Sequence, residues 1–413
     1  MIIMNPKITR SAPLALAALL TLVAQVHSQT PAQGRQAPPP PPPPPPPAAP
    51  AFGGPIPGLT PAQIAAFSEG LDEFRTVETV ASGLGPIYNN VSCVACHANP
   101  VPGGSSALMV TRFGRTTNGV FDPLTALGGS LLQEFAIDPR CQEVIPPQAN
   151  TIAHRQTTPL YGMGLIEAIP DSVIQALASR PSVDGVTGHA AHVQESAGQP
   201  VRVGRFGWKA QHADLLFFAG DAYLNEMGIT NRLFPTENAP NGNQALLAQF
   251  DTFADPEDAV DPATGKSDID RQTDFMRMLA PPPALPQSAS AVAGGKVFQN
   301  AGCAVCHVRS MNTGPSPIAA LSNKTVTLWS DLLLHDMSSL GDGIAQGDAS
   351  PTEMRTAPLW GLRAISPYLH DGRAPNLDDA IRDHDGEAKT ARNRYLNLSP
   401  AARQQLLDFL NTL

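Results

Sequence analysis

The stretch Cys303-Ala-Val-Cys306-His307 decides how this 413-residue chain is understood, because Cys93-Val-Ala-Cys96-His97 repeats it 210 positions upstream. Both stretches follow the pattern C-x-x-C-H, which is typical of c-type haem attachment. The two thiols bind the haem vinyl groups, and the adjoining histidine ligates the iron from one face. A single copy also fits a zinc half-site or a redox pair, whereas two copies favour two covalently bound haems.

The repetition extends beyond the cysteines. Residues 85–93 align without a gap on residues 295–303, with Gly, an aromatic residue, Asn and Cys in step. Further on, Thr158-Pro-Leu-Tyr-Gly-Met163 resembles Ala357-Pro-Leu-Trp-Gly-Leu362. Repetition of this kind predicts two related lobes, each with one haem. We therefore expect a mainly α protein with two cytochrome c-like lobes, internal duplication and long irregular loops.

The N-terminal region has the features of an export signal. Lys7 and Arg10 precede an apolar run over residues 12–26, and cleavage is expected after Ser28. A retained N-terminal anchor is the alternative, although the run is short for a membrane span. Residues 29–58 form a proline-rich linker, in which Pro38–Pro47 predicts a stiff polyproline II rod of roughly 31 Å. The expected location is periplasmic or secreted.

Loss of the signal would leave 25 basic and 36 acidic residues, a net charge of −11. This acidity argues against nucleic acid as a partner and allows docking of a basic electron donor, such as a soluble cytochrome or cupredoxin; simple solubility is the alternative. The length suits two domains. We expect an N-terminal haem lobe over residues 59–280 and a C-terminal one over residues 281–413, joined by a proline-rich linker after Ala280. No membrane span is expected in the mature chain.

Helices joined by Pro- and Gly-rich loops dominate the expected secondary structure, with little strand signal. The fifth cysteine, Cys141, has no partner left for a disulfide within the chain, so we expect a buried inert thiol or, less simply, a reactive one. Capping residues, prolines and apolar spacing predict five helices. They cover residues 61–71, 170–177, 211–227 and 289–300, and the residues that follow Ser399.

Several separate motifs, in the same order, resemble the dihaem oxidoreductase family, whose members are assigned as peroxidases and also labelled thiol oxidoreductases. The family is distantly similar to bacterial dihaem cytochrome c peroxidases. The resemblance covers roughly residues 70–413. Its motifs are Gly85 to His97, Gly162 to Pro170, Gly204 to Ala210, Asp331 to Met337 and Tyr368 to Ala374.

The resemblance also implies the ligands of the second haem. In the related peroxidases a Met on the far side of this haem follows the His of Tyr-Phe-His-Asp-Gly by fourteen residues. Here that His is His370, and position 384 is His384. We therefore expect the second iron to be held by His307 and His384, with a surface role for His384 as the alternative.

The far side of the first haem is less determined, because no histidine occurs between His97 and His154. Either the iron has an open or water-bound face, or a remote residue covers it. The candidates for that residue are His154, His212, Met109 and Met227.

An open face would need a proton shuttle. Our candidate is Glu167, whose apolar neighbours favour its protonated form; a helix-start carboxylate is the alternative. Arg155 would stabilise the departing hydroxide or pair with a haem propionate.

Aromatic residues are candidates for an electron bridge between the haems. Trp360, in the repeated Pro-Leu-aromatic-Gly element, is the first choice and Trp208 the competitor, with plain core packing as the alternative for both. His335 and His370 are expected to bond propionates or structural carbonyls. The related peroxidases bind calcium between their lobes, so calcium is a candidate cofactor that sequence alone does not place.

Three functions are compatible with these features. The first is an exported peroxidase-like enzyme, in which the C-terminal haem relays electrons to an N-terminal haem that reacts with hydrogen peroxide or another small oxidant. The second is a non-catalytic electron carrier with both irons closed. The third is oxidation of an organic or protein substrate through high-valent haem.

Overall fold

The computed structural model of the chain describes residues 52–253 and 259–413. The signal sequence and the proline rod lie outside the described residues. All of the described residues belong to one compact unit, Ala48–Leu413. Within the described part of the chain, no helix is long and apolar enough to cross a membrane.

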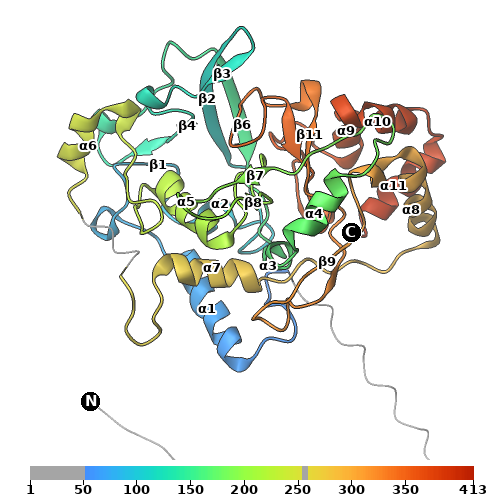
Figure 1. Ribbon diagram of the computed structural model, residues 1–413, viewed down its shortest axis with the longest axis horizontal. Helices are drawn as coiled ribbons and strands as arrows, with labels where there is room; N and C mark the ends of the chain where they lie inside the picture. The colour runs from blue at the N-terminus through green and yellow to red at the C-terminus, as the bar shows by residue number, and fades with distance from the viewer. Residues whose placement is uncertain (1–51, 254–258) are drawn as a thin grey trace, which may run out of the picture. The chain divides into compact units, whose positions relative to one another are not determined.

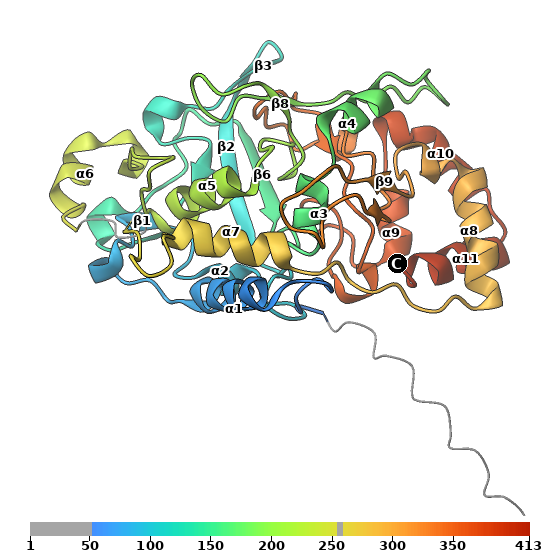
Figure 2. The same cartoon turned by 60° about the horizontal axis from the view of Figure 1, so that its bottom comes forward.

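Three helices of the N-terminal half surround the first C-x-x-C-H motif. Helix α1 (Pro61–Arg75) begins with a capping box, in which Thr60 and Gln63 satisfy each other's backbone N–H groups. It packs against α7 (Asp268–Met278), which also contacts α5 (Leu215–Met227). The crossing of α1 and α7 requires Gly70, because a Cβ there would lie 2.3 Å from the Arg271 carbonyl oxygen. Figure 2 shows α1 and α7 lying side by side.

Helices outweigh strands among the described residues, as expected, but one four-stranded sheet was not foreseen. Strand β2 (Met109–Thr117) pairs antiparallel with β3 (Val120–Asp122), β4 (Leu131–Leu132) and β6 (Thr151–Gln156), as Figure 1 shows. The longest ladder runs from Met109 opposite Gln156 to Gly114 opposite Thr151. Polar and charged residues on both faces of β2 and β6 hide the alternation that normally predicts a strand.

The C-terminal half is built on two helices that cross closely. Helix α8 (Ala289–Ala301) leads into the second C-x-x-C-H motif, and α11 (Pro400–Leu410), capped by Ser399, packs across it. Their contact centres on the rings of Phe298 and Phe409, 5.4 Å apart. A Cβ at Gly294 would lie 1.8 Å from the Gln405 carbonyl oxygen, so only glycine allows this approach. Figure 1 shows α8 and α11 next to each other at the right of the view.

The other elements are short. The five helices predicted from sequence all exist, with starts displaced by no more than four residues. One of these five is α4 (Asp171–Ala178). The described residues also form the α-helices α2 (Cys93–Cys96), α3 (Met163–Glu167), α6 (Gln244–Phe250), α9 (Leu377–Arg382) and α10 (Lys389–Leu396). Two-stranded pairs join β1 (Ile87–Tyr88) to β5 (Phe135–Ala136), β7 (His192–Val193) to β8 (Arg202–Val203), β9 (Met311–Asn312) to β10 (Thr325–Val326), and β11 (Leu334–Asp336) to β12 (Glu353–Arg355).

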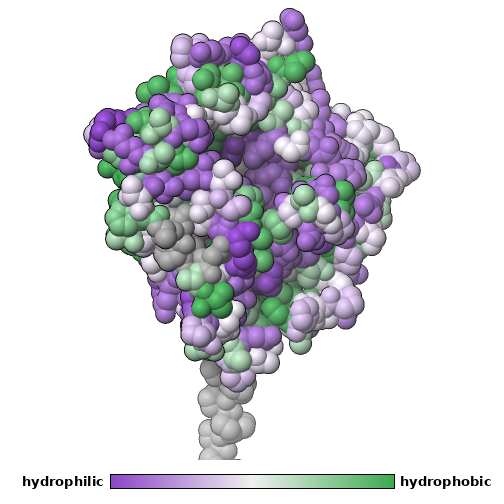
Figure 3. All heavy atoms as spheres, turned by 60° about the vertical axis from the view of Figure 1, so that its left-hand side comes forward, coloured by the Kyte–Doolittle hydropathy of each residue, from purple (hydrophilic) through white to green (hydrophobic). Residues whose placement is uncertain are grey.

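Residues 52–58, which the sequence places at the end of the proline-rich linker, pair with the end of α7. Ile56 donates its N–H to the Met278 carbonyl at 2.8 Å, and Ala280 donates to the Gly54 carbonyl at 3.0 Å. Ile56 is buried in the main core cluster. Figure 3 shows a mostly hydrophilic face, hollowed near its centre, with only scattered apolar residues.

Candidate haem-binding sites

The second motif stands at the edge of a large apolar cavity. Gly302 ends α8 in the left-handed conformation, with φ +91°, and the chain then turns so that His307 donates its backbone N–H to the Cys303 carbonyl at 3.0 Å. The turn brings both thiols and the imidazole to a cavity of about 290 Å³. Cys303, Cys306, His307 and His384 all line it.

His307 and His384 are held in the same manner. The Nδ1 atom of His307 lies 2.9 Å from the Trp329 carbonyl oxygen, and that of His384 lies 2.7 Å from the Ala380 carbonyl oxygen. Nδ1 therefore carries the proton and donates, which leaves Nε2 of each ring as a free base. Burial lowers the pKa of His307 to about 4 and also lowers the pKa of His384. Both imidazoles are neutral, as metal ligation requires.

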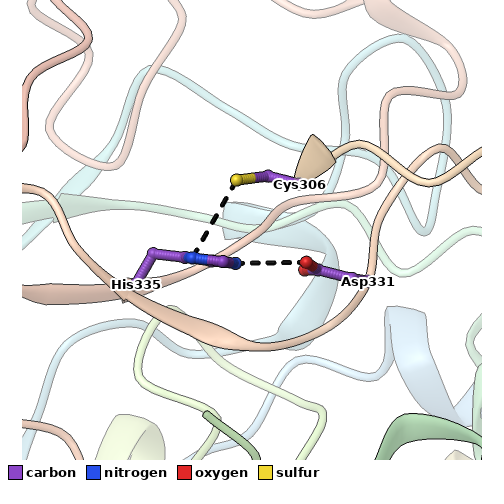
Figure 4. Close-up of side chains that lie close together, drawn as sticks. All are labelled: Cys306, Asp331 and His335. Carbon is purple, nitrogen blue, oxygen red and sulfur yellow. Dashed lines mark hydrogen bonds and ion pairs between the residues drawn. The ribbon is translucent and has the colours of Figure 1, made fainter. Parts of the chain in front are cut away.

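The His335 side chain contacts Cys306 of the second motif (Figure 4). Its Nε2 lies 3.2 Å from Asp331 and its Nδ1 lies 2.7 Å from Glu387, while the Cys306 sulfur is 3.9 Å away. Burial opposes a charge on this ring, but the hydrogen bonds that it donates to Asp331, Cys306 and Glu387 outweigh burial and raise the pKa of His335 to about 12. The partners are carboxylates rather than the carbonyls or propionates expected from sequence.

Cys306, Asp331 and His335 also have atoms close enough to share a metal ion. A protonated imidazole between two carboxylates has no lone pair to offer, and Cys306 belongs to the second C-x-x-C-H motif. We therefore assign this cluster to anchoring the motif rather than to a separate metal.

The first motif repeats the local geometry of the second. His97 donates its N–H to the Cys93 carbonyl at 3.0 Å, and its Nδ1 lies 3.0 Å from the Gly104 carbonyl oxygen. Burial lowers the pKa of His97 to about 4 and raises the pKa of Cys93 to about 12. The ring of Phe74 on α1 packs 5.9 Å from the imidazole.

The residues at both motifs fit a covalently bound haem. All four motif cysteines are free and half-buried. Each motif histidine is neutral and oriented through Nδ1, the arrangement that presents Nε2 to a metal. The large apolar cavity beside the second motif suits a flat apolar ring system.

A half-buried acid, Glu226, lies beside the first motif and was not found from the sequence. It is near the end of α5 and accepts a hydrogen bond from the Asn89 side chain at 2.9 Å. Burial raises the pKa of Glu226, and its charge contributes, after burial, to raising the pKa of Cys96 to about 11. Sequence gave little signal, because an acid in the last turn of an apolar helix is normally solvent-exposed.

Arg112 lies close enough to Glu226 for their charges to interact. Its Nη1 donates to the Ser130 hydroxyl at 3.1 Å, whereas its buried Nε has no hydrogen-bond partner within the described part of the chain. Burial lowers the pKa of Arg112, and the nearby Glu226 acts in the opposite direction. The pair thus offers one half-buried acid, whose charge acts on Cys96, and one incompletely bonded cation close to that acid.

Glu167 and Arg155 lie in structural ion pairs. The Glu167 carboxylate pairs with Arg277 of α7 through two hydrogen bonds of 2.5 and 2.9 Å, and it also accepts the N–H of Leu215, the first residue of α5. Arg155 is buried against Asp342, with a 2.7 Å hydrogen bond from Nε. Glu167 does not line the cavity. These contacts favour its structural alternative, a helix-start carboxylate.

The candidates for the far side of the first iron are dispersed. His212 lies between Glu195 at 3.0 Å and Asp221 at 3.4 Å. Burial opposes its charge, but these carboxylates raise the pKa of His212 to about 9, so the ring is protonated and unsuited to ligation. His154 is exposed on β6, with Nδ1 3.3 Å from the Thr111 hydroxyl.

The two methionines differ in their surroundings. Met227 is buried in a cluster that Cys93 also contacts. The Met109 side chain packs against Gly372.

Trp360, Trp208 and His370 line the same cavity as the second motif. Trp360 packs on Gly162, so the two repeated Pro-Leu-aromatic-Gly elements touch each other. Trp208 donates its indole N–H to the Gln156 carbonyl at 2.8 Å, and its ring meets that of His370 edge-on at 6.3 Å. Burial lowers the pKa of His370 to about 4.

The sequence matches the model of a protein family described as "Di-haem oxidoreductase, putative peroxidase" over residues 147–413. That region contains the second motif, and the first motif lies before it. No curated protein matched the sequence.

The solved structures that are similar to this chain share little sequence identity with it. Hydrazine synthase from Kuenenia stuttgartiensis is 15% identical, with 84% of this chain and 87% of that chain covered and a TM-score of 0.41. A MauG-like protein associated with microbial copper homeostasis is 14% identical, with coverages of 89% and 94% and a TM-score of 0.40. The diheme peroxidase BthA from Burkholderia thailandensis E264 is 14% identical, with both coverages 86% and a TM-score of 0.38. These likenesses are too low to assign an activity.

Proposed function

Because this chain belongs to the di-haem oxidoreductase family, we propose that it is an exported c-type cytochrome with peroxidase-like activity. In this proposal, electrons enter at the C-terminal haem and pass to an N-terminal haem that reduces hydrogen peroxide or another small oxidant. Haem iron with one open face binds and activates peroxide, whereas iron ligated on both faces transfers electrons. The division of labour therefore depends on the ligands that this chain supplies.

The observation that carries the proposal is the pair His307 and His384. Two neutral, carbonyl-anchored imidazoles on one cavity are suited to holding a metal from both sides. Cys303 and Cys306 attach the group at this site. Cys93, Cys96 and His97 do the same at the first site, where the described residues provide no second neutral histidine anchored in this way. This asymmetry supports an electron-transfer role for the second site and chemistry at the first.

Glu226 and Arg112 are the residues that we assign to the chemistry. A carboxyl group with a raised pKa binds a proton more readily than an ordinary glutamate, and it can take up and return that proton during cleavage of the peroxide bond. The Arg112 guanidinium, with its unpartnered Nε, can stabilise the departing hydroxide. These residues replace Glu167 and Arg155, whose side chains are engaged elsewhere.

Trp360 and Trp208 are candidate bridges for electrons between the two sites. Both line the cavity of the second motif. Trp360 also contacts Gly162 in the first copy of the repeated element. Trp360 therefore stays our first candidate for the electron bridge.

We further propose that the halves 59–280 and 281–413 arose by duplication. The left-handed Gly162 and Gly361, with φ +69° and +74°, each precede a short helix, which supports a common origin. The export signal, the covalent attachment of both haems and the periplasmic or secreted location belong to the same proposal. Its electron donor would be a basic soluble cytochrome or cupredoxin, matched to the acidic mature chain.

Steady-state oxidation of a reduced basic cytochrome by hydrogen peroxide tests this function. We expect turnover with the full-length protein carrying both haems, and a rate that falls as ionic strength rises. A protein that exchanges electrons with the cytochrome but does not consume peroxide would instead be an electron carrier. Peroxide-dependent oxidation of an organic or protein substrate, without cytochrome oxidation, would favour the third function.

A further inference from the structure

Lys209 is a fully buried lysine surrounded by oxygen atoms. Its side chain is 0% exposed, and the side chain of its partner Asp342 is 1% exposed. The ammonium nitrogen lies 3.0 Å from the Asp342 carboxylate. It donates to three backbone carbonyls, those of Ser350 at 3.1 Å, Pro351 at 3.3 Å and Glu353 at 2.5 Å. Four oxygens from one short segment therefore converge on one positive charge.

This oxygen cage joins the two halves of the chain. Lys209 precedes the linker at Ala280, whereas Asp342 and the three carbonyls follow it. Arg155, also from the first half, donates its Nε to the same carboxylate at 2.7 Å. Next to Lys209, the Trp208 carbonyl accepts the N–H of Arg355 at 2.9 Å. The ammonium thus fixes the position of the segment that carries Trp208 into the cavity.

The ligand set is one that a hard cation would take. Carbonyl and carboxylate oxygens are the usual protein ligands of calcium and similar ions. Buried carbonyls without a donor cost free energy, and a buried ammonium needs compensating oxygens. Burial lowers the pKa of Lys209 to about 8, against the opposing effect of Asp342, so the ammonium form prevails at neutral pH.

We propose that Lys209 is an internal cation that occupies an oxygen-lined site between the two halves, where a protein without this side chain would need a bound metal ion. The wild-type protein then requires no calcium at this place. Removal of the side chain opens a site for an external cation. Arg155 shares the Asp342 carboxylate and balances part of its charge, while the Glu353 carboxylate acts on Lys209 from further away. The open site therefore has little net negative charge and favours a monovalent cation over calcium.

Chemical rescue of Lys209→Ala in the full-length protein with both haems tests this proposal. Propylammonium restores the atoms that the substitution removes, and 1-propanol fills the same space without the charge. We expect Lys209→Ala to lower Tm by roughly 5 °C. Propylammonium should recover most of this loss, potassium ions part of it, and 1-propanol and calcium little.

Further variants separate charge from packing. Lys209→Met fills the space with an apolar chain and should be as destabilised as Lys209→Ala, whereas Lys209→Arg should stay close to the wild type. If the Ala and Met variants do not fold while the Arg variant does, the need for a cation is supported. Equal recovery with 1-propanol, or a Met variant as stable as the wild type, would overturn the proposal. Two results together would also overturn it: a wild-type Tm that falls when EGTA removes calcium, and a Tm of Lys209→Ala that recovers when calcium is added. None of these outcomes depends on peroxidase activity.

Discussion

His307 and His384 line one cavity, and each has its Nδ1 within 2.9 Å of a backbone carbonyl oxygen. Such anchoring fixes both the tautomer and the direction of the free nitrogen. The histidine that follows Cys306 and the histidine fourteen residues after His370 therefore form a matched pair.

The substitution His384→Gly should convert the second haem from low-spin to high-spin ferric iron, because one face loses its ligand. Electron paramagnetic resonance of the oxidised protein measures this change. His370→Asn is the matched control, since His370 lines the same cavity but has no carbonyl anchor, and its low-spin signal should persist. An unchanged low-spin signal in His384→Gly would exclude His384 as the ligand.

Glu226→Gln should lower kcat/KM for peroxide by roughly 10²- to 10⁴-fold, because the amide cannot take up and return the proton. Glu167→Gln is the control. It breaks the ion pair with Arg277 and should lower Tm while the chemical step continues. Stopped-flow reaction of each variant with peroxide separates the two effects. If Glu167→Gln stops the chemistry and Glu226→Gln does not, the original assignment from sequence is the correct one.

The stability of the protein should depend on His212 between about pH 6.5 and 9. Its pKa is raised to about 9 in the folded state, so the folded protein binds a proton that the unfolded chain releases. The stabilisation is fully present below pH 6.5 and is lost as the pH rises through 9, an effect on the order of 3 kcal/mol.

Urea unfolding of the wild type and His212→Gln at several pH values measures this contribution. The acids that face His212 are Glu195 and Asp221. The free energies of unfolding of the two proteins should differ most near pH 6 and converge above about pH 9. Parallel pH profiles would contradict the assignment of His212 as an imidazolium.

Two adjacent glycines of α8 should respond differently to alanine. At Gly294 a Cβ would meet the Gln405 carbonyl at 1.8 Å, and α11 would have to move away, with a loss of roughly 1–3 kcal/mol. At Gly295 the nearest atom is on the Phe409 ring at 3.5 Å, an ordinary contact. Gly295→Ala should therefore be neutral or stabilise the helix by up to about 1 kcal/mol. Thermal unfolding of both variants tests the closeness of the α8–α11 crossing.

Local signals explain which parts of the fold could be predicted. Thr60 and Ser399 cap helices next to prolines, and these signals depend only on neighbouring residues. The sheet around β2 was missed because Arg112 and Arg155 interrupt the apolar alternation, and tertiary contacts cover both, Arg112 partly and Arg155 almost fully. No local pattern reveals such a contact.

The same distinction applies to the site. Each C-x-x-C-H motif is a five-residue unit whose geometry is local, so it can be recognised from sequence. The prediction of His384 used a fixed spacing of fourteen residues after His370. Glu226 and Lys209 were missed because their roles come from burial and from partners more than 100 residues away in the sequence. Glu167 had the expected apolar neighbours in sequence, but Arg277 and Leu215 engage its carboxylate in the fold.

Electron paramagnetic resonance of the oxidised and half-reduced wild-type protein tests the proposed division of labour between the two haems. We expect one low-spin centre that stays low-spin, held by His307 and His384, and a second centre beside His97 that is high-spin at rest or becomes so on half-reduction. Two low-spin centres in both states, which bind neither cyanide nor peroxide, would contradict it.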